Sequence, residues 1–83
     1  MRRVARPALV VTFPTTAAAM AAEEVCGRRG LPGRMIPVPG EVRAGCGLAW
    51  KAGPGDWQTL SAAFAEEGVE VEGMAVIELL EFE

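Results

Sequence analysis

Apolar runs alternate with mixed segments along the chain, and their spacing predicts four strands and two helices. The run A-L-V-V-T-F at Ala8–Phe13 is continuously apolar and rich in β-branched residues, which is typical of a central strand covered on both faces. Pro14 ends this run. Within Ala17–Arg29 small apolar residues recur at helical spacing beside charged ones, and Gly30 supplies a C-terminal stop. The first half therefore predicts a strand followed by a helix.

The second half of the chain repeats this pattern after an additional strand. Two short strands are predicted, at Arg34–Val38 and Cys46–Ala52, and the loop that joins them contains proline, glycine and charged residues. Asp56 can cap a second amphipathic helix, which Gly68 ends. Val69–Leu79 then predicts a fourth strand, because apolar and acidic residues first alternate there and a denser apolar run follows.

The resulting order of elements, β-α-β-β-α-β, predicts an α+β fold with the ferredoxin-like arrangement. In that arrangement a four-stranded antiparallel sheet has the strand order 4-1-3-2, and two helices cover one of its faces. We expect a single domain over residues 1–83, with residues 1–7 as a flexible N-terminal tail and Leu80–Glu83 as a short acidic tail. The other face of the sheet stays open, and an apolar open face would favour a homodimer.

Composition narrows the range of functions. The chain has 83 residues, a net charge of −3 and no histidine, so nucleic-acid binding is disfavoured and the commonest general base and metal ligand is missing. Two cysteines cannot complete a four-thiolate metal site, and we expect neither a metal nor another cofactor. No apolar stretch approaches the length of a membrane span. We expect a cytoplasmic protein whose thiols are reduced.

The loop between the second and third strands carries the most distinctive chemistry. Cys46 stands between Gly45 and Gly47, which removes side chains on both sides of the sulfur and lets a bulky group approach it. Pro37 and Pro39 hold the preceding chain extended and stiff. This composition predicts a stiff loop that leaves the Cys46 thiol accessible.

The predicted topology places this thiol beside the start of the first helix, at Thr15 and Thr16. Amides in the first turn of a helix carry partial positive charge, which stabilises a thiolate. Arg34 and Arg43 would add to this effect, and Glu41 would oppose it or hold an arginine in place. The alternative is that the cysteine is a small buried hydrophobe at the start of a strand, since cysteine is among the most buried residue types.

Cys26 has the opposite environment. It follows Ala22 by four residues on the first helix, so packing explains it. It also lies about three turns from the helix start, roughly 15 Å away at 1.5 Å per residue. A disulfide needs Cα atoms within about 7 Å, so we predict no pairing of Cys26 with Cys46.

The chain resembles a small bacterial domain-of-unknown-function family described as carriers of selenium or sulfur (Se/S carrier protein-like). The resemblance runs from about Leu9 to Ile77 and rests on three pieces: T-F-P-T-T-A-A-A-M-A-A-E-E at Thr12–Glu24, R-M-I-P-V-P at Arg34–Pro39 and C-G-L-A at Cys46–Ala49. It implies a sulfur or selenium atom carried on Cys46.

Two positions depart from the pattern of that family. Relatives often have histidines at the start of the first helix, where this chain has alanines after Thr16. Many also have an arginine where this chain has Gly40, and Arg43 is a candidate substitute. The departures bear on how the thiol is activated.

Three functions fit the sequence. The first is a sulfur relay, in which Cys46 takes a persulfide group from a donor enzyme and passes it to an acceptor protein; such a carrier needs no substrate pocket of its own. The second is a noncatalytic interaction or regulatory module with a structural cysteine. The third is a thiol redox sensor, which would need an intermolecular disulfide because Cys26 is out of reach. None of the three involves nucleic acid or a membrane.

Overall fold

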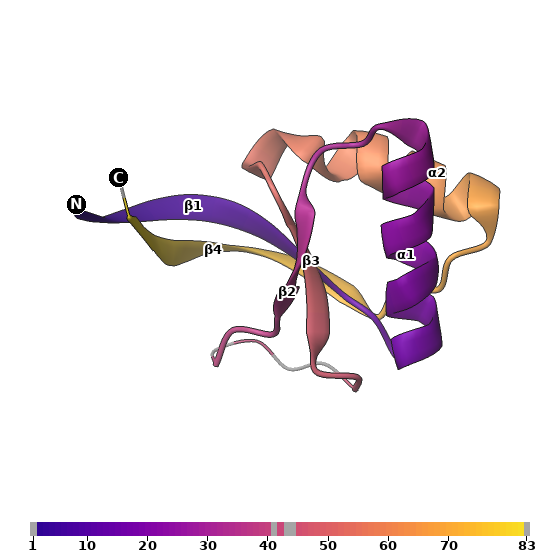
Figure 1. The fold of residues 1–83 in the computed structure, drawn as a ribbon, viewed down its shortest axis with the longest axis horizontal. Helices are drawn as coiled ribbons and strands as arrows, with labels where there is room; N and C mark the ends of the chain where they lie inside the picture. Colours follow the sequence, from indigo (N-terminus) through magenta and orange to yellow (C-terminus); the bar gives the residue numbers. More distant parts are fainter. Residues whose placement is uncertain (1, 41, 43–44, 83) are drawn as a thin grey trace.

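A computed structural model of the chain describes residues 2–40, 42 and 45–82 (Figure 1). It contains four strands, two α-helices and one 3-10 turn. Their bounds are β1 Arg3–Thr12, α1 Thr16–Arg29, β2 Arg34–Pro37, β3 Leu48–Ala52, η1 Pro54–Asp56, α2 Trp57–Glu67 and β4 Gly73–Phe82.

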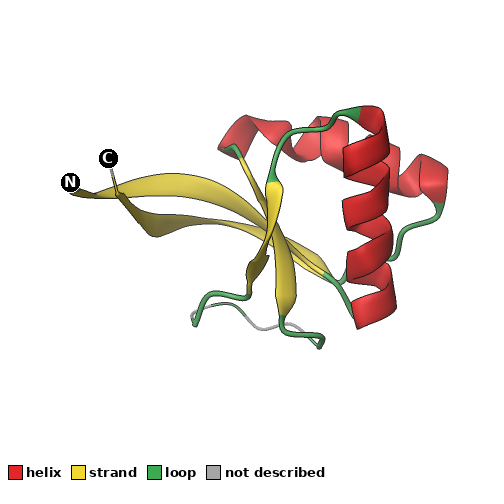
Figure 2. Cartoon of the chain, in the orientation of Figure 1, coloured by secondary structure: helices red, strands yellow, loops and turns green. Residues whose placement is uncertain are grey.

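The strands form one antiparallel sheet in the order β2-β3-β1-β4. Read from the β4 edge, this is the order 4-1-3-2 that the sequence predicts. Both helices lie on the same side of the sheet, so the predicted α+β class with an open sheet is confirmed (Figure 2).

The core lies between the helices and the central strands. Leu9 and Val11 of β1 alternate onto the helix side, and they pack with side chains from both helices and from β3. Phe13 and Phe64 meet edge to face, with ring centroids 6.0 Å apart. The fully buried positions of α1 are small, which lets this helix approach the sheet closely: Ala19, Ala22, Val25 and Cys26.

The ends of α1 follow the expected capping chemistry. The Thr15 hydroxyl accepts a hydrogen bond of 3.1 Å from the Ala18 amide. Gly30 has φ 67°, a left-handed conformation that glycine adopts without strain, and its amide bonds to the carbonyl of Cys26. Local sequence thus fixes where the helix begins and ends.

The two tails predicted from the sequence are wrong. β1 begins at Arg3, and residues 3–7 pair with residues 78–82 of β4 instead of forming a flexible tail. β4 runs on to Phe82 and therefore includes most of the expected acidic tail. Figure 1 shows β1 and β4 running side by side toward the two ends of the chain, away from the helices. Each segment supplies the other's backbone hydrogen bonds, an interaction that neither shows alone.

Within the described residues, no helix is long and apolar enough to cross a membrane.

Candidate functional site

Cys46 lies at the end of the β2–β3 ladder, in the segment of residues 38–47 that we call the thiol loop. Pro37 pairs with Leu48 at the last position of the ladder. Beyond it the Val38 amide donates a hydrogen bond of 3.0 Å to the Gly47 carbonyl. Cys46 therefore lies one residue beyond the last hydrogen bond between the two strands, and this bond fixes the backbone next to it.

The Cys46 side chain is half-buried and contacts the core from outside. Its Sγ donates to the Leu48 carbonyl at 3.5 Å, and the residue packs against the buried core cluster. A thiol can donate this bond and a thiolate cannot, so the bond must open before the sulfur can attack another group. The position is thus intermediate between the exposed thiol and the buried hydrophobe considered from sequence.

Gly45 brings the thiol loop against the end of β1. A Cβ added at Gly45 would lie 2.7 Å from the Pro14 carbonyl oxygen, closer than such atoms approach. The loop therefore lies beside Pro14, just ahead of α1, as the topology predicted. Thr15 uses its hydroxyl to cap the helix, and Thr16 is the first, exposed residue of α1.

Gly47 is glycine for a different reason. Its φ is 75°, in the left-handed region, while a Cβ there would meet open space. Sequence reasoning assigned both glycines to access at the sulfur. In the structure one allows close approach of the backbone and the other allows the turn into β3.

Glu72 is a site residue that sequence reasoning missed. Its Oε1 accepts a hydrogen bond of 3.1 Å from the Gly45 amide, and its own amide donates to the Thr12 carbonyl at 2.8 Å. The carboxylate therefore ties the residue before the cysteine to the segment entering β4. In the sequence Glu72 is one of several alternating acidic residues, and nothing there marks it.

Within the described part of the chain, the structure does not place the predicted cation Arg34 next to the Cys46 thiol. Arg34 pairs with Lys51 at the opposite end of the β2–β3 ladder from Cys46. Arg43 and Glu41 lie outside the described residues. The strand register explains the first result, because three residues of extended chain separate Arg34 from the loop end of β2.

The sequence model of one family, described as "Putative Se/S carrier protein-like", matches residues 8–76. The chain belongs to this Se/S carrier-like family. The matched span contains both cysteines and the thiol loop. A search of curated proteins and a search of solved structures each found no match.

The other cysteine of this Se/S carrier-like chain, Cys26, is part of the core. Cys26 is 2% exposed, and burial raises the pKa of its thiol to about 11. Both cysteines are free, so the prediction that they do not pair is confirmed. In the part of the chain that the structure describes, no group of three His, Cys, Asp or Glu side chains gathers to hold a metal ion.

Proposed function

We propose that this protein carries sulfur or selenium on Cys46, receiving it from a donor enzyme and passing it to an acceptor protein. One observation carries the proposal: of the two cysteines in the chain, Cys26 is buried and Cys46 is partly exposed, in a loop anchored on both sides. Membership of the Se/S carrier-like family supports it. The relay belongs in a reducing compartment such as the cytoplasm, where both thiols persist.

The chemistry is an exchange at sulfur without net oxidation. The Cys46 thiolate attacks the outer sulfur of a persulfide on the donor enzyme, a new S–S bond forms, and the donor's S–S bond breaks to release its cysteine thiolate. An acceptor thiolate then attacks the outer sulfur on Cys46, which leaves as thiolate. The two steps move one sulfur atom, and selenium follows the same path as a selenenyl sulfide.

Activation in this proposal begins with loss of the hydrogen bond from Sγ to Leu48. The positive end of the α1 dipole, at Thr15 and Thr16, then favours the thiolate, and Arg43, which lies outside the described residues, stays a candidate cation from the sequence alone. The Glu72 carboxylate, bound to the neighbouring amide, works against the thiolate while it holds the loop in place.

Intact-protein mass spectrometry tests the proposal. The protein is incubated with a cysteine desulfurase and free cysteine, and in a parallel reaction with free selenocysteine. We expect the reducible gain of one sulfur or selenium atom on wild type and on Cys26→Ala, and no gain on Cys46→Ser. Cys26→Ala is the matched control because it removes the other thiol and keeps a small apolar group in the helix.

Absence of the added atom from all three proteins, with folding verified by circular dichroism, would contradict the carrier function. Equal loading of Cys46→Ser and wild type would move the carrier site away from the thiol loop.

A second candidate, an interaction module with a structural cysteine, is favoured by the contact of Cys46 with the core. Its contact surface would be β4, an edge strand that exposes Met74, Val76 and Leu80. A module of this kind would acquire no sulfur in the mass-spectrometry assay, and its Cys46→Ser variant would lose stability.

A further inference from the structure

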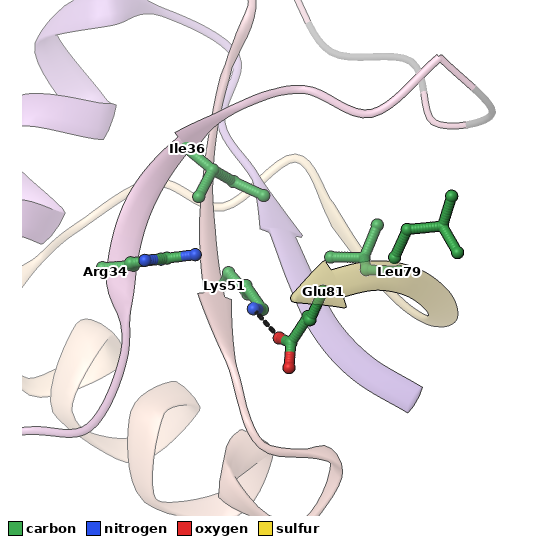
Figure 3. Close-up of a pocket in the computed structure, with 6 residues that line it drawn as sticks. Arg34, Ile36, Lys51, Leu79 and Glu81 are labelled. Carbon is green, nitrogen blue, oxygen red and sulfur yellow. Dashed lines mark hydrogen bonds and ion pairs between the residues drawn. The ribbon is translucent and has the colours of Figure 1, made fainter. Parts of the chain in front are cut away.

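The face of the sheet opposite the helices is hollowed into a pocket of about 590 Å³ (Figure 3). Because side chains alternate along a strand, residues paired with Val10 lie on the face away from Leu9 and Val11, which pack against the helices. The pocket is lined by Arg34, Ile36, Lys51, Leu79, Leu80 and Glu81. We call it the open-face pocket. Its charged residues Arg34 and Lys51 pair at the end of the β2–β3 ladder away from Cys46.

Charged groups converge on this pocket from all four strands. Lys51 of β3, whose side chain is 16% exposed, donates a hydrogen bond to Glu81 Oε1, as the dashed line in Figure 3 marks. Arg6 of β1 approaches the other oxygen, with Nε 3.7 Å from Glu81 Oε2. Hydrogen bonding by Lys51 and the charges of Lys51, Arg6 and Arg34 lower the pKa of Glu81, so the carboxylate is ionised at neutral pH.

Arg34 remains available in this arrangement. Among the described residues, its guanidinium makes no hydrogen bond and no ion pair within bonding distance, although its charge reaches Glu81. Arg34 also borders a second, smaller hollow of about 270 Å³. Among the residues that line the pocket, two cations, Arg34 and Lys51, face one carboxylate, Glu81, so the lining carries an excess of positive charge in a chain whose net charge is −3.

We propose that the open-face pocket binds a small molecule that carries a carboxylate on an apolar body. Arginine presents a planar pair of N–H donors that matches a carboxylate, and a partly buried lysine adds a second charge. Ile36 and Leu79 supply the apolar wall. The volume falls within the range of small-ligand sites.

The Lys51–Glu81 pair sets the strength of binding. A bound carboxylate competes with Glu81 for the Lys51 ammonium, so the internal pair weakens binding. Removing the Glu81 charge should therefore tighten the complex, and removing the Arg34 charge should weaken it. This opposite response of two residues in one pocket distinguishes recognition of an anion from hydrophobic adsorption. The proposal does not rest on sulfur transfer, since Cys46 does not line the pocket and the Arg34–Lys51 pair lies at the other end of the ladder.

Titration of ¹⁵N-labelled protein with sodium octanoate, followed by two-dimensional NMR, tests the proposal. We expect saturable shifts of the Arg34, Ile36 and Lys51 amides. Arg34→Gln should weaken binding about tenfold or more, since a hydrogen bond to a charged group is worth about 1.5–3 kcal/mol and each 1.4 kcal/mol is tenfold. Glu81→Gln should tighten binding several-fold. Arg28→Gln is the control, because Arg28 is an ion-paired arginine on α1, outside the pocket.

Two further probes decide the class of ligand. Octanol has the apolar body without the charge, and it should shift the same amides weakly or not at all. Equal binding of octanol and octanoate, or equal octanoate affinity of Arg34→Gln and Arg28→Gln, would overturn the proposal. Binding of a hexaglutamate peptide at these amides without binding of octanoate would also overturn it, and would identify the face as a docking surface for an acidic protein segment.

Discussion

The backbone amide of Gly45 donates a hydrogen bond of 3.1 Å to the carboxylate of Glu72, which lies 27 residues further along the chain. The residue that precedes Cys46 is therefore held by the segment that leads into β4. The Glu72 amide in turn donates a hydrogen bond to the Thr12 carbonyl. Glu72 therefore links the thiol loop to β1, a central strand of the sheet. The same contact brings a negative charge toward the thiol.

Neutralising Glu72 should make Cys46 more reactive. Glu72→Gln keeps an oxygen that can accept from Gly45 and removes the charge, so the thiolate is stabilised. We expect a rate increase of roughly twofold to fivefold, since two unit charges about 4 Å apart in water interact by about 1 kcal/mol. The measurement is the rate constant for alkylation by iodoacetamide at pH 7. Glu70→Gln is the control, because it removes an exposed carboxylate two residues away. Equal rates in the two variants would show that Glu72 exerts no electrostatic effect on the thiol.

The two glycines beside the thiol should tolerate alanine poorly for different reasons. Gly45→Ala places a Cβ 2.7 Å from the Pro14 carbonyl oxygen, and overpacking of this kind costs about 1–3 kcal/mol. Gly47→Ala forces a side chain into φ 75°, at about 1–2 kcal/mol. Gly40→Ala is the control, since no atom lies within 4 Å of its added Cβ. Urea unfolding measures all three, and a midpoint for Gly45→Ala equal to that of Gly40→Ala would refute the contact.

The hydrophobic pattern of the sequence predicted the helices and strands of the fold well. The part that it missed, the first half of β1, is explained by the pairing of β1 with β4. The run at Ala8–Phe13 predicts a central strand, and its first five residues, 8–12, form the buried part of β1. The five residues before Ala8, R-V-A-R-P, form no continuous apolar run, and all but the partly buried Val4 are exposed in a strand that only β4 completes. A strand defined by its partner cannot be recognised from its own sequence.

The residues of the candidate site also fall into two groups, those that the sequence marks and those that it does not. Cys46 and its glycines could be found from sequence because composition marks them. The position of Arg34 could not, since it depends on which residue of β3 it pairs with. Glu72 is joined to the loop by a contact between segments far apart in the chain, and one acidic residue among several gives no local sign of that.

Loss of the helix cap should destabilise α1. Thr15→Ala removes the hydroxyl that accepts from Ala18, at a cost of about 0.5–2 kcal/mol in unfolding free energy. Thr15→Ser keeps the acceptor and should stay close to wild type. Thr16→Ala changes an exposed threonine inside the helix and is the matched control. If Thr15→Ala and Thr16→Ala unfold at the same urea concentration, the cap contributes nothing measurable.

Alkaline pH should weaken the fold through Cys26. Burial raises the pKa of this thiol from its ordinary value of 9.0 to about 11 in the folded protein, so the unfolded chain loses the thiol proton first as pH rises. The contribution of the neutral thiol to stability is complete below pH 9 and is lost progressively between pH 9 and 11. Urea unfolding at half-unit steps from pH 8 to 10.5 should show this fall in wild type and in Cys46→Ser, and a shallower fall in Cys26→Ala, which has no buried thiol to titrate. A parallel decline in all three proteins would assign the alkaline loss to other groups and leave Cys26 with a packing role alone.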